Sequence, residues 1–201
     1  FYYLRLKIKR PVMKKLFSLF LLTSLASQAQ ENKVLSSKKN EFRVDLLSAV
    51  VYTKASISYE LFFGKDFSTG INVNFSNSNK LNEDFDNGYR NNVPKFEFNP
   101  YLRYALSKSK SRYYFAEIFG SYNGGDYKEI IRMGDMAMPD YYTTKKSKYT
   151  DFGLGGSLGY KMYFKDSIAL EFIVGFGSNL TNRDKSPDVI SRVGLNLGYR
   201  F

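Results

Sequence analysis

Apolar and polar residues alternate along most of the chain beyond residue 40. In the segment 189–201 an apolar residue fills nearly every odd position, while Gly, Asn or Arg fills nearly every even one. Successive side chains of a β-strand point to opposite faces, so this period of two predicts a strand with one apolar and one polar face. One face for hydrocarbon and one for a polar, partly cationic interior are typical of the strands of transmembrane barrels.

Seven further segments follow the same rule, and most have about the 9 to 11 residues that a tilted strand needs to cross the hydrocarbon layer. The full set is 41–50, 55–63, 67–75, 96–106, 112–122, 149–164, 168–177 and 189–201. The pattern therefore predicts an all-β protein, an eight-stranded antiparallel up-and-down transmembrane β-barrel. A soluble lipocalin-like barrel, which points its apolar face inward, is the alternative fold.

The connections between these segments alternate in length. Short links are expected at 64–66, 107–111 and 165–167, and longer loops at 76–95, 123–148 and 178–188. Transmembrane barrels have short turns on the periplasmic side and longer loops on the outside. The alternation therefore supports the same topology and assigns the long loops to the cell surface.

Two features mark irregular places in the predicted sheet. Pro100 lies inside the fourth segment and cannot donate a ladder hydrogen bond, so we expect a bulge or a locally unpaired site there. The sixth segment, 149–164, contains four glycines. Their small size suits tight curvature or packing beside bulky side chains of the lumen.

The first 40 residues divide into three parts. Residues 1–12 precede Met13, and we interpret them as sequence upstream of the natural start. Residues 13–29 combine two lysines, a short apolar run and small residues near their end, which predicts a secretory signal peptide cleaved before Gln30. Residues 30–40 are polar and predict a flexible periplasmic lead-in. The barrel itself is expected over 41–201.

The basic character of the chain comes partly from that leader. Of the 30 Lys and Arg residues, six lie within residues 1–29, where there is no acid, which leaves 24 bases against 19 acids. The net charge of +11 therefore falls to about half after cleavage, and a nucleic-acid partner loses most of its support.

The sequence contains neither His nor Cys. Without Cys there is no disulfide framework and no thiolate metal site. Histidine is the usual general base near neutral pH, because its pKa lies there. Since the enzymes known with this architecture rely on histidine, we expect no catalytic activity, no catalytic residues and no cofactor.

The polar faces of the predicted strands collect charge. Their acids and bases are nearly balanced in number and are Arg43, Asp45, Glu60, Glu97, Arg103, Glu117, Asp151, Lys161, Glu171, Arg192 and Arg200. Isolated buried charges would be very costly, whereas paired and hydrogen-bonded ones are tolerated. We therefore expect a salt-bridged network that fills the lumen of a small barrel. A proton or ion path along the same groups is the alternative.

The long loops hold the remaining candidate chemistry. The largest carries candidate contact residues that are apolar or aromatic, namely Met133, Met136, Met138, Tyr141 and Tyr142. Thioethers can bind Cu(I), but an adaptable surface for a partner, or a cap over the barrel mouth, is the expected role. The acidic run 82–88 has hard oxygen ligands for Ca²⁺ but departs from EF-hand spacing, which favours a solvated turn.

Signal, strand pattern and loop order together resemble the small bacterial outer-membrane β-barrel proteins of the OmpA and OmpX type. The aromatic residues Tyr199 and Phe201 resemble the signal by which the barrel assembly machinery takes its substrates. The resemblance implies Sec-dependent export, a Gram-negative outer-membrane location and a monomer in contact with lipid and lipopolysaccharide. Unlike the longer members of that family, this protein is expected to have no periplasmic peptidoglycan-binding domain.

This resemblance leaves the function open among three classes, since one scaffold serves several roles. The expected role is non-catalytic, either structural in the cell envelope or a surface-binding or adhesion role, with a protein or ligand bound at the loops. A small transporter or narrow porin-like channel is the alternative. An outer-membrane enzyme is disfavoured because histidine is absent.

Overall fold

A computed structural model describes residues 38–201, except for 52, 64–65, 108, 110 and 136–137. The upstream segment, the predicted signal peptide and residues 30–37 lie outside the described residues. Eight antiparallel strands form a closed barrel in which β1 pairs with both β2 and β8. The predicted all-β, eight-stranded fold is confirmed, and its elements are β1 (Asn40–Asp45), α2 (Leu46–Val51), β2 (Lys54–Phe63), β3 (Phe67–Ser76), α3 (Asn79–Asp86), β4 (Asn92–Ala105), β5 (Arg112–Asp135), β6 (Met138–Phe164), β7 (Ile168–Asn179) and β8 (Val189–Arg200).

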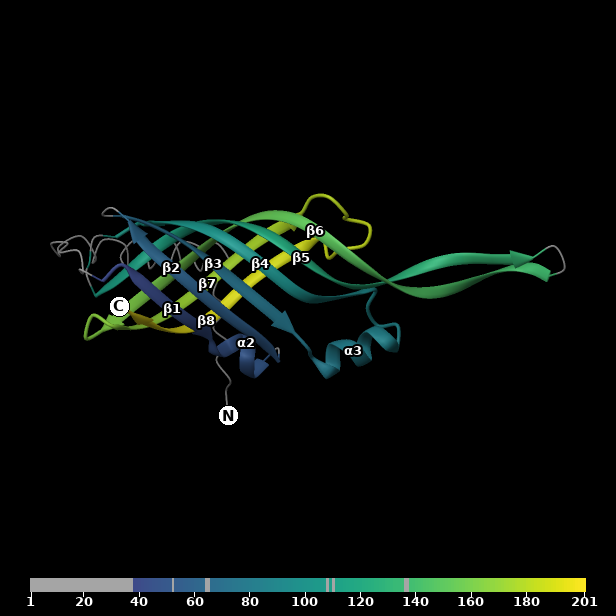
Figure 1. The fold of residues 1–201 in the computed structure, drawn as a ribbon, viewed down its shortest axis with the longest axis horizontal. Helices are drawn as coiled ribbons and strands as arrows, with labels where there is room; N and C mark the ends of the chain where they lie inside the picture. Colours follow the sequence, from purple (N-terminus) through teal and green to yellow (C-terminus); the bar gives the residue numbers. More distant parts are fainter. Residues whose placement is uncertain (1–37, 52, 64–65, 108, 110, 136–137) are drawn as a thin grey trace, which may run out of the picture.

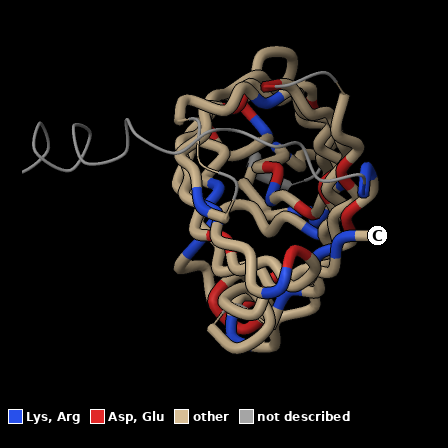
Figure 2. The backbone as a smooth tube through the Cα atoms, turned by 90° about the vertical axis from the view of Figure 1, so that its left-hand side faces the viewer, with Lys and Arg blue, Asp and Glu red and all other residues tan. Residues whose placement is uncertain are grey.

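The barrel has an apolar outside and a polar inside. Side chains such as Ile118 and Phe172 are exposed on the outer surface, whereas Glu60 and Lys161 are fully buried in the lumen. Each strand alternates between these two environments, as the period of two requires. Viewed end-on, the wall forms a ring (Figure 2). Among the described residues, no helix is both long enough and apolar enough to cross a membrane.

Exposed aromatic side chains form two rows at different heights. Phe63, Phe67 and Tyr104 lie in register on neighbouring strands near the short turns. Phe98, Tyr122 and Phe152 do so near the long connections. Rows of this kind flank the apolar band of membrane barrels. We call the end of the barrel with the short turns the turn end, and the opposite end the loop end.

The first strand is shorter than predicted. The alternation indicated a strand over 41–50, but β1 ends at Asp45 and residues 46–51 form the helix α2. Asp45 causes the change, because its carboxylate accepts hydrogen bonds from the backbone N–H groups of Leu47 (3.0 Å) and Ser48 (3.2 Å) and from the Ser48 hydroxyl (2.6 Å). Such bonds satisfy the free donors of a first helical turn.

The prediction of a loop at 123–148 is also wrong. There β5 and β6 continue as a long hairpin that projects beyond the rest of the barrel (Figure 1). Within this segment Ile130, Ile131, Thr143 and Thr144 face one another in two directly opposed pairs, and such β-branched residues favour strands. Length alone suggested a loop, while local composition supports a strand.

The run expected to be a solvated turn within the 76–95 loop is instead mostly helical. Residues 79–86 form α3, which begins after Ser78, whose hydroxyl accepts from the backbone N–H of Leu81. This helix lies beside the base of the hairpin (Figure 1). The acidic side chains of the run therefore project from a helix. A helix does not arrange them as a calcium-binding loop would.

Pro100 interrupts pairing as expected, although the bulge lies elsewhere. Residues 99 and 100 have no partner on β5, while the register on either side is unchanged. The bulge occurs between Pro94 and Phe96. The glycines of β6 pack as predicted beside bulky lumenal groups, because a Cβ at Gly155 or Gly159 would overlap an aromatic ring of β5.

Candidate functional site in the barrel lumen

The centre of the lumen is organised around the ammonium group of Lys161. Its Nζ lies 2.8 Å from Glu41 Oε1, 2.8 Å from Glu60 Oε2 and 3.1 Å from Glu171 Oε2. These carboxylates come from β1, β2 and β7, and all four side chains are completely buried. One cation therefore ties three strands to β6.

The same three carboxylates have the spacing of a metal site. One oxygen of each lies within 4.8 Å of the others. The Lys161 ammonium contacts one oxygen of each group, and Arg43 and Arg103 also bond Glu60. The protein itself thus supplies the positive charge that a metal ion would bring, so the cluster is a salt-bridge centre.

Arg103 extends the cluster toward β5. Its Nε is 2.6 Å from Glu117 Oε2, and its Nη1 is 2.9 Å from Glu60 Oε2 and 2.7 Å from Glu171 Oε2. The guanidinium also lies over the Phe115 ring, 4.2 Å from its centroid. Arginine suits this position because its planar group offers several donors in fixed directions.

Arg43 and Arg192 complete the cluster on β1 and β8. Arg43 bonds Glu41 (2.8 Å) and Glu60, and donates to the Tyr101 hydroxyl at 2.6 Å. Arg192 Nη1 bonds Glu117 Oε1 at 2.6 Å. With these two, four cations face four carboxylates, and the charges balance within the cluster.

Every strand of the barrel contributes to this lumenal network. Strand β3 joins through Ser68, whose hydroxyl donates to Glu60 Oε1 at 2.5 Å. The other members are Glu41, Arg43, Glu60, Arg103, Glu117, Lys161, Glu171 and Arg192, on the seven remaining strands. Buried ion pairs of this kind are stable only when mutually satisfied. Chemically, the arrangement fills the lumen and fixes the strands relative to one another.

Four of the charged residues predicted for the lumen serve other contacts. Asp45 caps α2 and accepts from the backbone N–H of Leu195. Glu97 bonds Lys54 at 2.6 Å, near the loop end. Arg200 lies over the Phe62 ring, 3.9 Å from its centroid, at the turn end. These three side chains point inward but do not belong to the network. Asp151 is the fourth residue.

Asp151 holds the β7–β8 connection. Its carboxylate accepts from the backbone N–H groups of Thr181 (2.8 Å) and Asn182 (3.0 Å), and from the Ser186 hydroxyl at 2.5 Å. The side chain is almost fully buried although it lies near the loop end. Asp151 therefore orders a loop and does not join an ion pair among the described residues.

Sequence reasoning missed Glu41, Lys54 and the tyrosines that bond the network. Glu41 has the inward parity of β1, two residues before Arg43, and its position as the first residue of the expected strand obscured it. Tyr163 donates to Glu41 Oε2 at 2.5 Å. Its inward parity on β6 was the available signal, whereas its partner 122 residues away in sequence was not predictable from local pattern.

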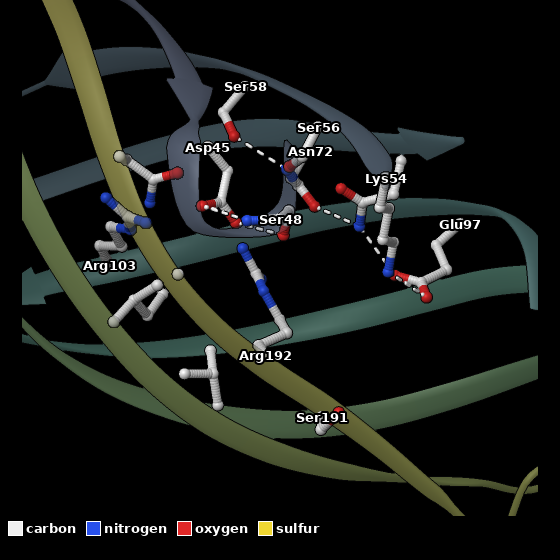
Figure 3. Close-up of a pocket in the computed structure, with 15 residues that line it drawn as sticks. Asp45, Ser48, Lys54, Ser56, Ser58, Asn72, Glu97, Arg103, Ser191 and Arg192 are labelled. Atoms are coloured by element: carbon white, nitrogen blue, oxygen red, sulfur yellow. Dashed lines mark hydrogen bonds and ion pairs between the residues drawn. The ribbon is translucent and has the colours of Figure 1, made fainter. Parts of the chain in front are cut away.

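On the loop-end side of the network, the lumen is lined by neutral polar groups. Figure 3 shows this region, where the Asn72 amide donates to the Ser56 and Ser58 hydroxyls at 3.1 Å and 2.9 Å. The Asn74 amide donates to Glu97 Oε2 at 2.7 Å. Hydroxyls and amides can both donate and accept, so this region is suited to hydrogen-bonding a guest.

The hairpin beyond the barrel carries most of the predicted loop contacts. We call residues 128–135 with 138–146 the β5–β6 ribbon; past Lys128, β5 and β6 pair only with each other among the described residues. Ile130 and Tyr142 are 74% and 71% exposed. Met133 lies opposite Tyr141, and both are exposed. Met136 and the side chain of Met138 lie outside the described residues.

Helix α3 docks on the base of this ribbon. Lys128 and Lys146 face each other across the strands, an arrangement that like charges disfavour. Both ammonium groups lie near the Phe85 ring, and Lys146 Nζ is 2.5 Å from Asp86 Oδ1. The hydrogen bond from Lys146 holds the pKa of Asp86 below its usual range.

The predicted assembly residues lie on the outer surface at the turn end. The Tyr199 and Phe201 rings are stacked with centroids 6.3 Å apart, and both are exposed. The backbone of Phe201 exchanges hydrogen bonds with Asn40, next to the start of β1. These aromatics therefore flank the junction where β8 meets β1.

The fold and the inside-out distribution of residues define the class of this protein as a small eight-stranded β-barrel of the outer-membrane type. The N-terminal β-barrel domain of Pseudomonas aeruginosa OprF has a similar structure, with a TM-score of 0.52 and 10% identity over 82% of this chain and 98% of that domain. Neisserial surface protein A (NspA) matches with a TM-score of 0.50 and 10% identity, over 81% of this chain and 95% of NspA. At such identities the similarity is one of fold.

A family model described as "Protein of unknown function (DUF3575)" matches residues 16–192, so the chain belongs to that family. The comparison with curated proteins finds no match. The family description gives no role, and the similar structures show the fold.

Proposed function

We propose that this protein is a monomeric, non-catalytic outer-membrane barrel that acts at the cell surface and binds a partner through the β5–β6 ribbon. The observation that carries the proposal is a two-stranded ribbon that projects from the barrel with large apolar side chains exposed on both faces. Isolated two-stranded hairpins are marginally stable in water. Exposed apolar patches commonly mark sites of interaction.

The two aromatic rows support insertion in the outer membrane, with the ribbon outside the cell. The short connections lie at the turn end and the long ones at the loop end, the order of a barrel whose turns face the periplasm. Lys145, Lys146 and Lys148 then lie just beyond the outer aromatic row, where anionic lipopolysaccharide head groups are plausible neighbours. Export through the Sec route and insertion by the barrel assembly machinery belong to this proposal.

The lumenal network supports a closed barrel over the channel alternative. Its ionic groups are almost fully buried and are bonded to one another across the whole cross-section. An eight-stranded barrel has an interior just wide enough for such side chains, whereas open pores need about 16 strands. The proposed role therefore lies at the surface, where the ribbon stands.

Surface exposure of the ribbon is the first test. The chain has no cysteine, so Tyr142→Cys provides a single thiol on the ribbon and Ser111→Cys provides one at the turn end. In intact cells a membrane-impermeant maleimide should label the first variant, and should label the second only after the outer membrane is permeabilised. Equal labelling of both variants in intact cells would contradict the proposed orientation.

Contact with a partner and closure of the lumen are tested on the same protein. A photoreactive benzoyl-phenylalanine replacing Tyr142 should give a discrete covalent adduct in intact cells, whereas the same group replacing Phe152, in the outer aromatic row, should crosslink only lipid. Planar-bilayer recordings of the wild-type barrel should show no stable openings. Lipid as the sole product at both positions would argue for a purely structural role, and large steady openings would favour a channel.

A further inference from the structure

The barrel wall is incomplete in its loop-end half. Strand β1 pairs with β8 only as far as Asp45, opposite Asn196, and with β2 only as far as Val44, opposite Ile57. Strand β8 continues for seven residues beyond that point, to Val189. The described part of the chain places no strand between β8 and β2 there; α2 contacts both.

Hydrogen bonds at the turn end show which backbone groups face this gap. Phe201 N donates to Asn40 O beside β1, and Arg200 N donates to Ser167 O beside β7. Odd-numbered residues of β8 therefore direct their N–H and C=O groups toward β1. The last of these to find a β1 partner is Leu195, whose N–H donates to the Asp45 carboxylate at 3.2 Å.

Beyond Leu195, the backbone groups of Val193 and Ser191 face the gap with no β1 residue opposite them. The facing edge of β2 is in the same position. Phe62 N donates to Lys39 O, so even-numbered residues of β2 face β1, and Ser56 lies past the last β1 partner. Open strand edges are costly in lipid unless polar groups cover them.

A cavity of about 340 Å³ occupies this part of the wall. Its lining includes Val189, Ser191 and Val193, which point outward on β8, together with the inward-facing Ile190 and Glu97. In a continuous sheet, neighbouring strands separate the two faces of a strand. A cavity lined by both faces of β8 therefore passes around the free edge of that strand and connects the outer surface with the lumen.

A smaller adjoining cavity reaches deeper into the lumen, and Figure 3 shows its lining. The two cavities share Ser48, Lys54, Glu97, Ser191 and Val193. Hydroxyl and amide groups dominate the polar lining, and the cations of the smaller cavity are already paired, Lys54 with Glu97 and Arg192 with Glu117. In the larger cavity, Arg90 donates from its Nε to the Asn92 carbonyl. The outer mouth is apolar, with Val189 and Val193 on β8.

We propose that this opening binds an outer-leaflet amphiphile whose uncharged, hydroxyl-rich head group, such as a sugar, enters the lumen while its acyl chain stays against the outer face of β8. The paired cations of the smaller cavity disfavour an anionic head group there, because a phosphate that entered it would have to break an existing ion pair. Hydroxyls can instead bond the serines, the asparagine amides and the free backbone groups of both edges. The inference rests on the proposed insertion in the outer membrane.

The test uses the full barrel in phosphatidylcholine nanodiscs that also contain galactosyl diacylglycerol or phosphatidylglycerol with matched acyl chains. Lipid retained by the released protein is counted by native mass spectrometry. We expect the galactolipid to be retained about tenfold more than either phospholipid, a difference that one or two net hydrogen bonds supply. Equal retention of all three, or a preference for phosphatidylglycerol, would overturn the proposal.

Two valines that lie directly opposite each other provide a matched pair of variants. Val193 borders the gap, whereas Val174 on β7 lies in the closed wall, and both are exposed on the outside. Val193→Trp should fill the mouth and abolish the preference, while Val174→Trp should keep it. Asn74→Ala should weaken retention of the galactolipid alone. A preference that survives Val193→Trp would contradict lateral entry.

Free methyl galactoside separates a lipid head group from a soluble sugar. If it binds as tightly as the galactolipid, the acyl chain contributes nothing and lateral entry is overturned; weaker binding supports it. Failure of insertion is recognised independently, because a folded barrel migrates differently on a gel before and after heating. An inserted barrel without lipid preference sinks this inference alone, and a chain that does not insert sinks the proposed function.

Discussion

The turn-end and loop-end halves of the barrel differ in how their strands are paired and in how their buried polar groups are satisfied. Near the turn end every strand is paired on both sides, and four buried cations are matched to four carboxylates. Near the loop end the wall is interrupted past Asp45, and neutral hydroxyl and amide groups line the cavity. One barrel thus combines a rigid, filled half with a half that has open hydrogen-bonding capacity.

The difference follows from how many polar groups of each half are already satisfied by hydrogen bonds and ion pairs within the protein. A carboxylate such as Glu60, bonded by three cations and a hydroxyl, has little capacity left for a guest. The serines and asparagines on its loop-end side bond one another through neutral hydrogen bonds, and their hydroxyl and amide groups can both donate and accept. We therefore expect stability to depend on the turn-end half and recognition on the loop-end half.

The largest effect should come from removing a cation in the turn-end half. Arg103→Ala removes the closest cation from buried Glu171 and one of the two equally close cations from Glu117, which should lower the free energy of unfolding by about 3 to 5 kcal/mol. Lys54→Ala breaks a pair at the loop end whose side chains are 20% and 13% exposed, so it should cost less than Arg103→Ala, whose partners are completely buried. Urea titration of both variants in lipid vesicles tests the contrast; similar midpoints would mean that the lumen is wet throughout.

A smaller effect is expected from filling a glycine position in the wall. A Cβ at Gly159 would overlap the Phe115 ring, so Gly159→Ala should cost about 1 to 3 kcal/mol, the usual penalty of overpacking. Gly156 faces outward, and its nearest neighbour would be 3.6 Å from an added Cβ, so Gly156→Ala should be neutral. Thermal unfolding of the two variants checks this, and Phe115→Leu should restore the first only in part, because the Phe172 carbonyl oxygen would still lie 2.7 Å from the added Cβ. Two equally stable variants would show that the ring relaxes freely.

The smallest effect concerns the contact between α3 and the ribbon. Since the pKa of Asp86 is lowered by Lys146, the contact should be fully formed at neutral pH and lost only as the pH falls below the ordinary aspartate value of about 3.9. The NMR signals of the Phe85 ring should follow that titration, and Asp86→Asn should remove it while leaving barrel stability unchanged. A midpoint above the ordinary value would contradict the pairing.

The strands were predictable because the alternation of apolar and polar residues within each strand reflects lipid on one face and the lumen on the other. From β2 to β8 the period of two identified the side chains that face lipid and those that face the lumen, so the charged residues of the interior could be named from sequence. Which charges meet could not be named. Lys161 bonds Glu41 across 120 residues of sequence, and that juxtaposition depends on the register of strands that no local pattern specifies.

Two of the misjudged segments have local causes of opposite kind. Residues 46–50 are apolar enough to continue a strand, but Asp45 offers its carboxylate to the first helical turn and ends β1. Residues 123–148 are long enough for a loop, but opposed β-branched pairs extend the hairpin. The opening in the wall follows from the early end of β1 at Asp45. It could therefore not be predicted from the sequence without predicting α2.

The network that joins all eight strands also has a consequence for folding. Glu41 bonds Lys161 and Arg43 bonds Glu171 across the lumen, from β1 to β6 and β7, and these two contacts cannot form before β1 has met β8. The stabilisation therefore arrives late, when loop-closure entropy has already been spent. A half-assembled sheet would lack the bonds that Glu41 and Arg43 make to β6 and β7, so partial barrels miss this part of the stabilisation and closure of the cylinder becomes more cooperative.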